Sequence, residues 1–166
     1  MDPLEIAYLV DALFIMVLMY LAFVDLRSFR LPNAITLPFM IAGLSLNVFS
    51  GAGFTNPQSA LIGALLGYAL LWIPNFLYRL LKKRDGIGMG DAKLLAALGA
   101  WLGWDSLPGI LLIASISGLI GGILWLKWHK HRYSQAFPFG PFLCIAGIIQ
   151  LLWPQFLNII LPIQQI

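Results

Sequence analysis

Residues 81–93 read Leu-Lys-Lys-Arg-Asp-Gly-Ile-Gly-Met-Gly-Asp-Ala-Lys and form the longest hydrophilic stretch of this 166-residue chain. One apolar run, at about 58–80, precedes this stretch, and another begins within it and continues to about residue 106. Hydrophobic residues make up 60% of the chain and charged residues only 10%. Soluble globular domains do not have such a composition. The sequence therefore predicts an all-α integral membrane protein.

Six apolar runs approach the length of about 20 residues that a membrane-spanning helix needs. They cover about 6–24, 34–50, 58–80, 91–106, 108–128 and 138–160. The second and fourth runs are short, and a re-entrant hairpin of two adjacent runs would also fit the charge pattern. No long polar linker divides the chain, so we expect about six transmembrane helices in a single domain over residues 1–166.

The basic residues give the orientation of these runs. All ten lie after the first run, between the third and fourth, or between the fifth and sixth: Arg27, Arg30, Arg79, Lys82, Lys83, Arg84, Lys93, Lys127, Lys130 and Arg132. The positive-inside rule places these connections in the cytoplasm, which leaves both termini on the non-cytoplasmic side. The net charge of +3 is then an orientation signal and does not indicate nucleic acid as a partner.

Asp25 ends the first run and Asp91 opens the fourth, so both carboxylates are expected at the cytoplasmic level of the bilayer. An acid beside hydrocarbon is costly unless it is paired or used. Two acids at one level suit an aspartic protease, in which one activates water and the other, protonated, donates to the substrate carbonyl. This chemistry needs no metal or cofactor. The structural alternative makes Asp91 a helix N-cap and pairs Asp25 with Arg27, Arg30 or Lys93.

Gly88 and Gly90 precede Asp91 and leave the backbone unobstructed. An extended peptide could lie along them as an added strand, which makes them candidate substrate-binding residues. His129 and His131 have no third ligand nearby, so we expect no metal site. Cys144 is expected to be a small buried residue.

Other small and aromatic residues have structural explanations. The pairs Gly63/Gly67 and Gly118/Gly122 are expected to pack helices within one subunit. Five tryptophans fall near predicted helix ends, and we interpret them as interfacial anchors: Trp101, Trp104, Trp125, Trp128 and Trp153.

Two segments closely resemble the type IV prepilin peptidases, which are membrane aspartyl proteases with a Gly-x-Gly-Asp motif. They read Asp25-Leu-Arg-Ser-Phe-Arg-Leu-Pro-Asn33 and Gly86-Ile-Gly-Met-Gly-Asp-Ala-Lys-Leu-Leu-Ala-Ala-Leu-Gly-Ala-Trp-Leu-Gly-Trp104. The segment Pro138-Phe-Gly-Pro141 resembles a third family segment. The resemblance covers roughly residues 20–145.

The resemblance implies a multi-pass enzyme of the bacterial inner membrane that removes leader peptides from type IV prepilins or pseudopilins at the cytoplasmic face. It implies that Asp25 and Asp91 are catalytic. It also makes Lys93, Pro32 and Asn33 candidate substrate-binding residues beside the two glycines. Many relatives carry two Cys-x-x-Cys pairs in a part linked to N-methylation. This sequence has one cysteine, so we expect a peptidase without zinc and doubt methyltransferase activity.

Two alternatives stay open. Intramembrane proteases of the presenilin or signal-peptide-peptidase kind also use Gly-x-Gly-Asp, but their partner aspartate lies well inside a helix. A non-catalytic membrane component, such as an assembly scaffold, would tolerate loss of either carboxylate. The sequence does not indicate an oligomeric state.

Overall fold

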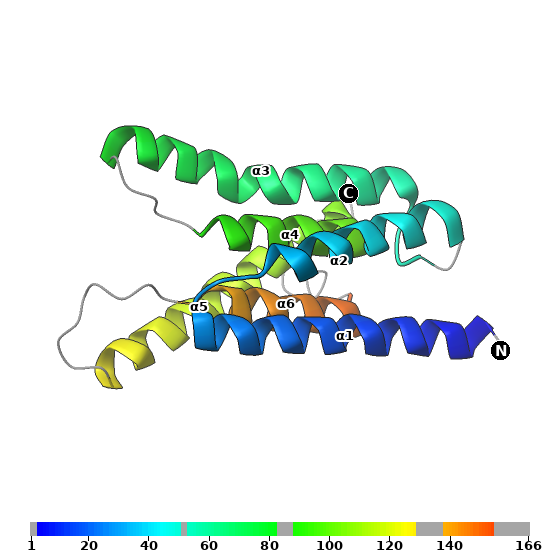
Figure 1. The fold of residues 1–166 in the computed structure, drawn as a ribbon, viewed down its shortest axis with the longest axis horizontal. Helices are drawn as coiled ribbons and strands as arrows, with labels where there is room; N and C mark the ends of the chain where they lie inside the picture. Colours follow the sequence, from blue (N-terminus) through cyan, green and yellow to red (C-terminus); the bar gives the residue numbers. More distant parts are fainter. Residues whose placement is uncertain (1–2, 51–52, 83–87, 129–137, 155–166) are drawn as a thin grey trace, which may run out of the picture.

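The computed structural model of the protein describes residues 3–50, 53–82, 88–128 and 138–154 (Figure 1). In these residues all regular structure is helical, and each predicted apolar run overlaps one α-helix. The helices are α1 (Pro3–Ser28), α2 (Asn33–Ser45), α3 (Pro57–Lys82), α4 (Met89–Leu102), α5 (Leu107–Trp128) and α6 (Gly140–Leu152). A π-helical turn, η1 (Leu46–Ser50), extends α2, and a 3₁₀ turn, η2 (Trp104–Ser106), precedes α5.

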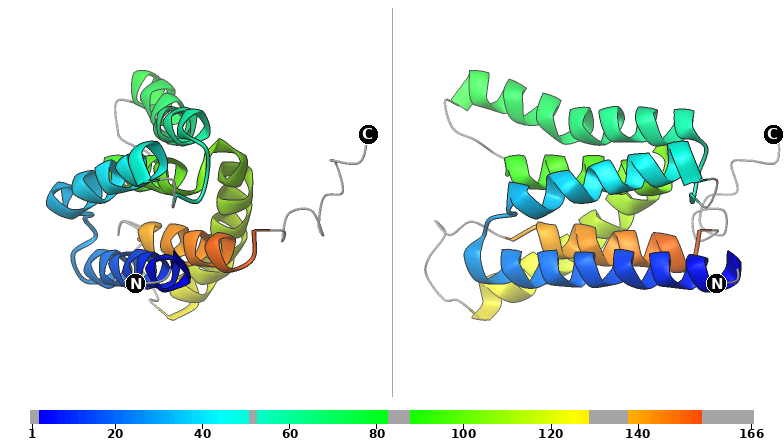
Figure 2. Two further views of the ribbon diagram at one scale, coloured as in Figure 1. Left: turned by 90° about the vertical axis from the view of Figure 1, so that its right-hand side faces the viewer. Right: turned by 45° about the vertical axis from the view of Figure 1, so that its right-hand side comes forward.

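Successive helices run in opposite directions along the bundle (Figures 1 and 2). One end of the bundle therefore holds the last residues of α1, α3 and α5 together with the first residues of α2, α4 and α6. We call it the aspartate end, because Asp25 and Asp91 lie there. Gly86 and Ile87 of the glycine-rich segment, and the predicted polar residues His129 and His131, lie outside the described residues.

Three segments among the described residues are long and apolar enough to cross a membrane: Leu4–Ser28, Pro57–Lys82 and Trp104–Leu124. The apolar helices Asn33–Phe49 and Gly140–Leu152 are shorter. The prediction of an all-helical fold is thus confirmed for the described residues, with three candidate membrane-spanning segments. The 14 residues of α4 extend over about 21 Å, less than the roughly 30 Å of a bilayer core.

Helix α4 occupies the interior of the bundle. It packs mainly against α2 and α3 and also contacts α6, while α1 and α5 pack against α6. Every residue from Leu94 to Trp101 is buried. A Cβ at Gly63 would strike the backbone carbonyl of Gly99, and one at Gly67 would lie 2.6 Å from the backbone oxygen of Leu95. The prediction that this glycine pair packs helices within one subunit is therefore confirmed, and it lets the α3 and α4 backbones touch.

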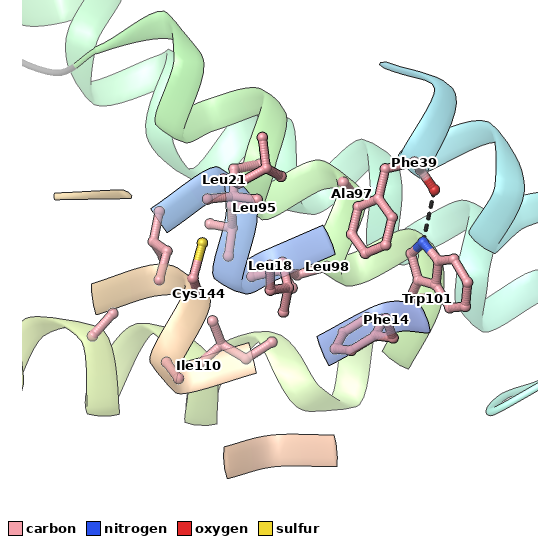
Figure 3. Close-up of a cluster of buried hydrophobic side chains, with 14 of the residues drawn as sticks. Phe14, Leu18, Leu21, Phe39, Leu95, Ala97, Leu98, Trp101, Ile110 and Cys144 are labelled. Carbon is pink, nitrogen blue, oxygen red and sulfur yellow. Dashed lines mark hydrogen bonds between the residues drawn. The ribbon is translucent and has the colours of Figure 1, made fainter. Parts of the chain in front are cut away.

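Trp101 belongs to the hydrophobic core, where it lies beside Phe14 and Phe39, and is only 1% exposed (Figure 3). Its ring stacks on Phe39 and meets the edge of Phe14, with centroid distances of 5.0 and 5.2 Å. Its Nε1–H donates to the carbonyl of Phe39 at 2.7 Å, which satisfies the only polar atom of the side chain. The interpretation of Trp101 as an interfacial anchor is therefore wrong.

Trp104 and Trp153 are 47% and 61% exposed, as expected for anchors near helix ends. The structure describes the backbone of Trp125 and Trp128 in α5 but not their side chains. In α5 the close glycine contacts occur at Gly118 and Gly121, where added Cβ atoms would meet phenylalanine rings at the start of α6.

A buried asparagine fixes the far end of α4. Asn47, in η1, donates through Nδ2 to the carbonyls of Ala100 at 2.8 Å and Trp101 at 3.0 Å. Its Oδ1 accepts from the backbone N–H of Thr55 at 3.1 Å. Carbonyls in the last turn of a helix have no partner within the helix. Asn47 therefore supplies side-chain donors to the C-terminal end of α4.

Candidate active site

Asp25 lies in the last turn of α1 and is 5% exposed. The helix ends immediately afterwards, where Phe29 donates its N–H to the Asp25 carbonyl at 2.8 Å and adopts a φ of +52°. A non-glycine residue seldom adopts this left-handed conformation, which turns the chain away from the helix axis. The side chain of Ser28 supports the turn by hydrogen bonds to the carbonyls of Val24 and Arg30.

Asp91 lies in the first turn of α4 and is half-buried. The N-cap position belongs to Gly88, whose carbonyl accepts the N–H of Asp91 at 3.1 Å, and no side chain caps this helix end. The interpretation of Asp91 as an N-cap is therefore wrong. A Cβ at Gly88 would lie 3.1 Å from Asp91 Oδ2, so the glycine leaves room for the carboxylate.

The fold brings the two carboxyl groups close enough to interact electrostatically. Cys144, on α6, is close enough to interact with both. Its thiol is free and buried, as predicted for this residue. Two acids remote in sequence therefore lie close together at one end of the bundle, beside the buried Cys144.

Among the described residues, Arg27 and Lys93 contact groups other than Asp25, contrary to the pairing that the structural alternative requires. The Asp25 Oδ2 atom has no hydrogen-bond partner in the described part of the chain. Lys93 Nζ donates instead to Asn33 Oδ1 at 2.8 Å, and the Arg27 guanidinium lies over the Phe23 ring, 4.4 Å from its centroid. The Asp25 carboxyl group accepts a hydrogen bond from the backbone N–H of Gly140.

The connection between α1 and α2 covers this site. A Cβ at Gly90 would lie 3.0 Å from the Cβ of Leu31, and one at Gly140 would lie 3.3 Å from its Cδ1. Leu31 is thus wedged between the first turns of α4 and α6. The carbonyl of Pro32 accepts the N–H groups of Ile35 and Thr36 and begins α2.

All seven predicted site residues gather at the aspartate end: Asp25, Pro32, Asn33, Gly88, Gly90, Asp91 and Lys93. Lys93 and Asn33, both predicted substrate-binding residues, are hydrogen-bonded to each other and so link α4 to α2. Sequence reasoning missed Leu31 and Gly140 as site residues. Only the family resemblance of residues 138–141 pointed toward Gly140.

The model of the type IV leader peptidase family matches residues 12–123, a segment that includes both aspartates. The chain belongs to this family. The type IV leader peptidase resemblance predicted from the two motif segments is thus confirmed.

Three relatives are each named prepilin leader peptidase/N-methyltransferase. The protein from Aeromonas hydrophila is 47% identical over 137 residues, which are 82% of this chain and 47% of the relative. The one from Dickeya chrysanthemi is 44% identical over 79% of this chain and 46% of its own length. The one from Burkholderia pseudomallei strain K96243 is 42% identical over 78% of this chain and 41% of its own length.

The chain spans about half the length of the curated relatives it matches. No solved structure gave a significant match to it.

Proposed function

We propose that this protein is a membrane aspartic endopeptidase that removes the leader peptide of type IV prepilins or pseudopilins. The observation that carries the proposal is the meeting of Asp25 and Asp91, from two different helices, in a chain of the leader peptidase family. The relatives' names also include N-methyltransferase. The proposal concerns peptidase activity alone.

In the proposed mechanism the two carboxyl groups share one proton, because two close like charges resist simultaneous ionisation. The ionised member removes a proton from water as the water attacks the scissile carbonyl, and the protonated member donates to that carbonyl oxygen. Asp91 is the more exposed of the two and lies at the N-terminus of α4, where a negative charge is favoured. We therefore assign the base to Asp91 and the acid to Asp25.

We propose that the substrate approaches along the exposed edge of the aspartate end. Gly88 is exposed and lacks a side chain, and Gly90 follows two residues later in the first turn of α4. Lys93, Pro32 and Asn33 border the same edge, so these five residues are proposed to bind the leader peptide. An extended peptide laid on this backbone would place its scissile bond next to the carboxyl pair.

We also propose a topology of six crossings in the bacterial inner membrane, with both termini outside and the site at the cytoplasmic face. The alternating helix directions support it. The basic residues whose side chains are described also support it, since they all lie on helix ends or connections at the aspartate end: Arg27, Arg30, Arg79, Lys82 and Lys93. Because its neighbours bury α4, this short helix crosses within protein rather than against lipid.

The test uses the purified protein in lipid nanodiscs with a prepilin, and follows the cleaved product. Asp25→Asn and Asp91→Asn should each lower kcat by at least about 100-fold, since an amide performs neither role. Asp11→Asn and Asp105→Asn are matched controls at the opposite end of the bundle and should retain activity. Cleavage at the wild-type rate by either variant of the pair would contradict the mechanism. Absence of cleavage by the wild-type protein would favour a non-catalytic assembly component.

The position of the cut separates the leader peptidase from an intramembrane protease of the presenilin kind. Asp25 stands in the last turn of α1 rather than in its middle, which favours a cut outside the substrate's own spanning helix. Mass spectrometry of the products distinguishes the two. A cut inside the substrate helix would overturn the leader peptidase proposal.

A further inference from the structure

The first turn of α6 presents a backbone donor to Asp25. Helix α6 begins at Gly140, and the N–H groups of Phe142 and Leu143 already donate to the carbonyl of Phe139. Pro141 has no N–H. The first-turn donor that remains is therefore that of Gly140, and it is directed at the Asp25 carboxyl group.

The same residue also provides space. A Cβ at Gly140 would lie 2.6 Å from Asp25 Oδ2 and 3.0 Å from Cγ. Asp25 is only 5% exposed in this position, and its Oδ2 has no hydrogen-bond partner among the described residues. Asp25 Oδ2 thus rests against the bare Cα of Gly140.

We infer that Gly140 is a positioning residue for Asp25. Its N–H orients the carboxyl group, and its missing side chain lets Oδ2 sit against the start of α6. The inference rests on the proposed function, and it assigns to α6 a part in the reaction that neither aspartate-bearing helix can supply.

The size of the effect follows from the contact. An ordinary Cβ contact begins at 3.4 Å, so an alanine at position 140 requires Oδ2 or its surroundings to move by about 0.8 Å. A displacement of about 1 Å at a catalytic group can cost roughly 100-fold in rate. We expect Gly140→Ala to lower kcat by at least about 30-fold with KM changed by less than about threefold.

Gly147→Ala is the matched control. It makes the same change on the same helix, and its Cβ would also lie 2.6 Å from a neighbour, but that neighbour is the end of the Leu98 side chain. A flexible side chain can move aside, and no carboxyl group is involved. Its kcat should stay within about threefold of wild type, while its thermal stability in nanodiscs should fall about as much as that of Gly140→Ala.

A second variant separates the donor from the space. Glycolic acid incorporated at position 140 replaces the N–H with an oxygen and adds no atom. Because the donor favours the ionised carboxyl group and Asp25 is assigned as the acid, its loss should shift the alkaline limb of the kcat/KM profile upward by at least about 0.5 pH unit. A purely structural role would leave that limb in place.

These measurements test the positioning role of Gly140 separately from the proposed peptidase function. A wild-type protein that cleaves no prepilin removes the proposed function. A wild-type protein that cleaves, with Gly140→Ala equal to Gly147→Ala in kcat and an unchanged pH profile for the ester, overturns the role of Gly140 alone. If the alanine variant fails to fold, the ester variant decides.

Discussion

Replacing Asn47 by alanine should release the far end of α4. The substitution removes three hydrogen bonds that a buried side chain makes to the backbone of Ala100, Trp101 and Thr55. Interhelical hydrogen bonds in membrane proteins average about 0.6 kcal/mol, and a typical intramolecular bond contributes about 1 kcal/mol. We therefore expect Asn47→Ala to lower the free energy of unfolding by about 2–3 kcal/mol.

The control is Asn56→Ala. Asn56 Oδ1 accepts the N–H of Ser59 at 2.7 Å, a single local bond at the exposed start of α3. Loss of such a helix cap costs about 1 kcal/mol. The two variants make the same chemical change but should differ by at least about 1 kcal/mol.

The measurement is unfolding of the protein in mixed micelles by titration with SDS, followed by tryptophan fluorescence. Both variants should retain the slope of the wild-type transition and differ in its midpoint. An Asn47→Ala variant no less stable than Asn56→Ala would show that the end of α4 does not depend on this side chain.

Three further predictions use the same titration. Trp101→Phe keeps an aromatic ring in the core but leaves a buried carbonyl without its donor at 2.7 Å, so it should cost about 1–3 kcal/mol; unchanged stability would mean that water replaces the donor. Gly67→Ala places a Cβ against the α4 backbone and should cost about 1–3 kcal/mol, whereas Leu65→Ala on the exposed face should stay within about 0.5 kcal/mol; equal effects would count against backbone contact. Lys93→Met and Asn33→Ala should couple by about 0.6 kcal/mol in a double-mutant cycle, and strict additivity would argue that their 2.8 Å bond does not form.

The sequence predicted the course of the chain because hydrophobicity and charge act locally. The six apolar runs match the six helices, and the basic residues in alternate connections match their alternating directions. The aspartates were found for the same reason, since an acid at the edge of an apolar run is costly wherever the helix packs.

The tertiary neighbours of each residue could not be predicted in this way. Trp101 looked like an anchor because it lies near the end of a run, yet packing against Phe14 and Phe39 places it in the core. Gly140 and Leu31 carry no charge or periodicity, so apart from their place in the family motif segments the sequence gives no signal that they contact the site. Their contacts depend on how helices remote in sequence pack.

The close approach of α3 and α4 has a consequence for biogenesis. Helix α4 has 14 residues and carries Asp91 and Lys93 in its first turns, so it is a poor substrate for the insertion machinery on its own. Helix α3 is 26 residues long, and its glycines accept the α4 backbone directly. The two helices are consecutive in synthesis. A ribosome that delivers them as one hairpin would let the longer helix bring the shorter one into the lipid.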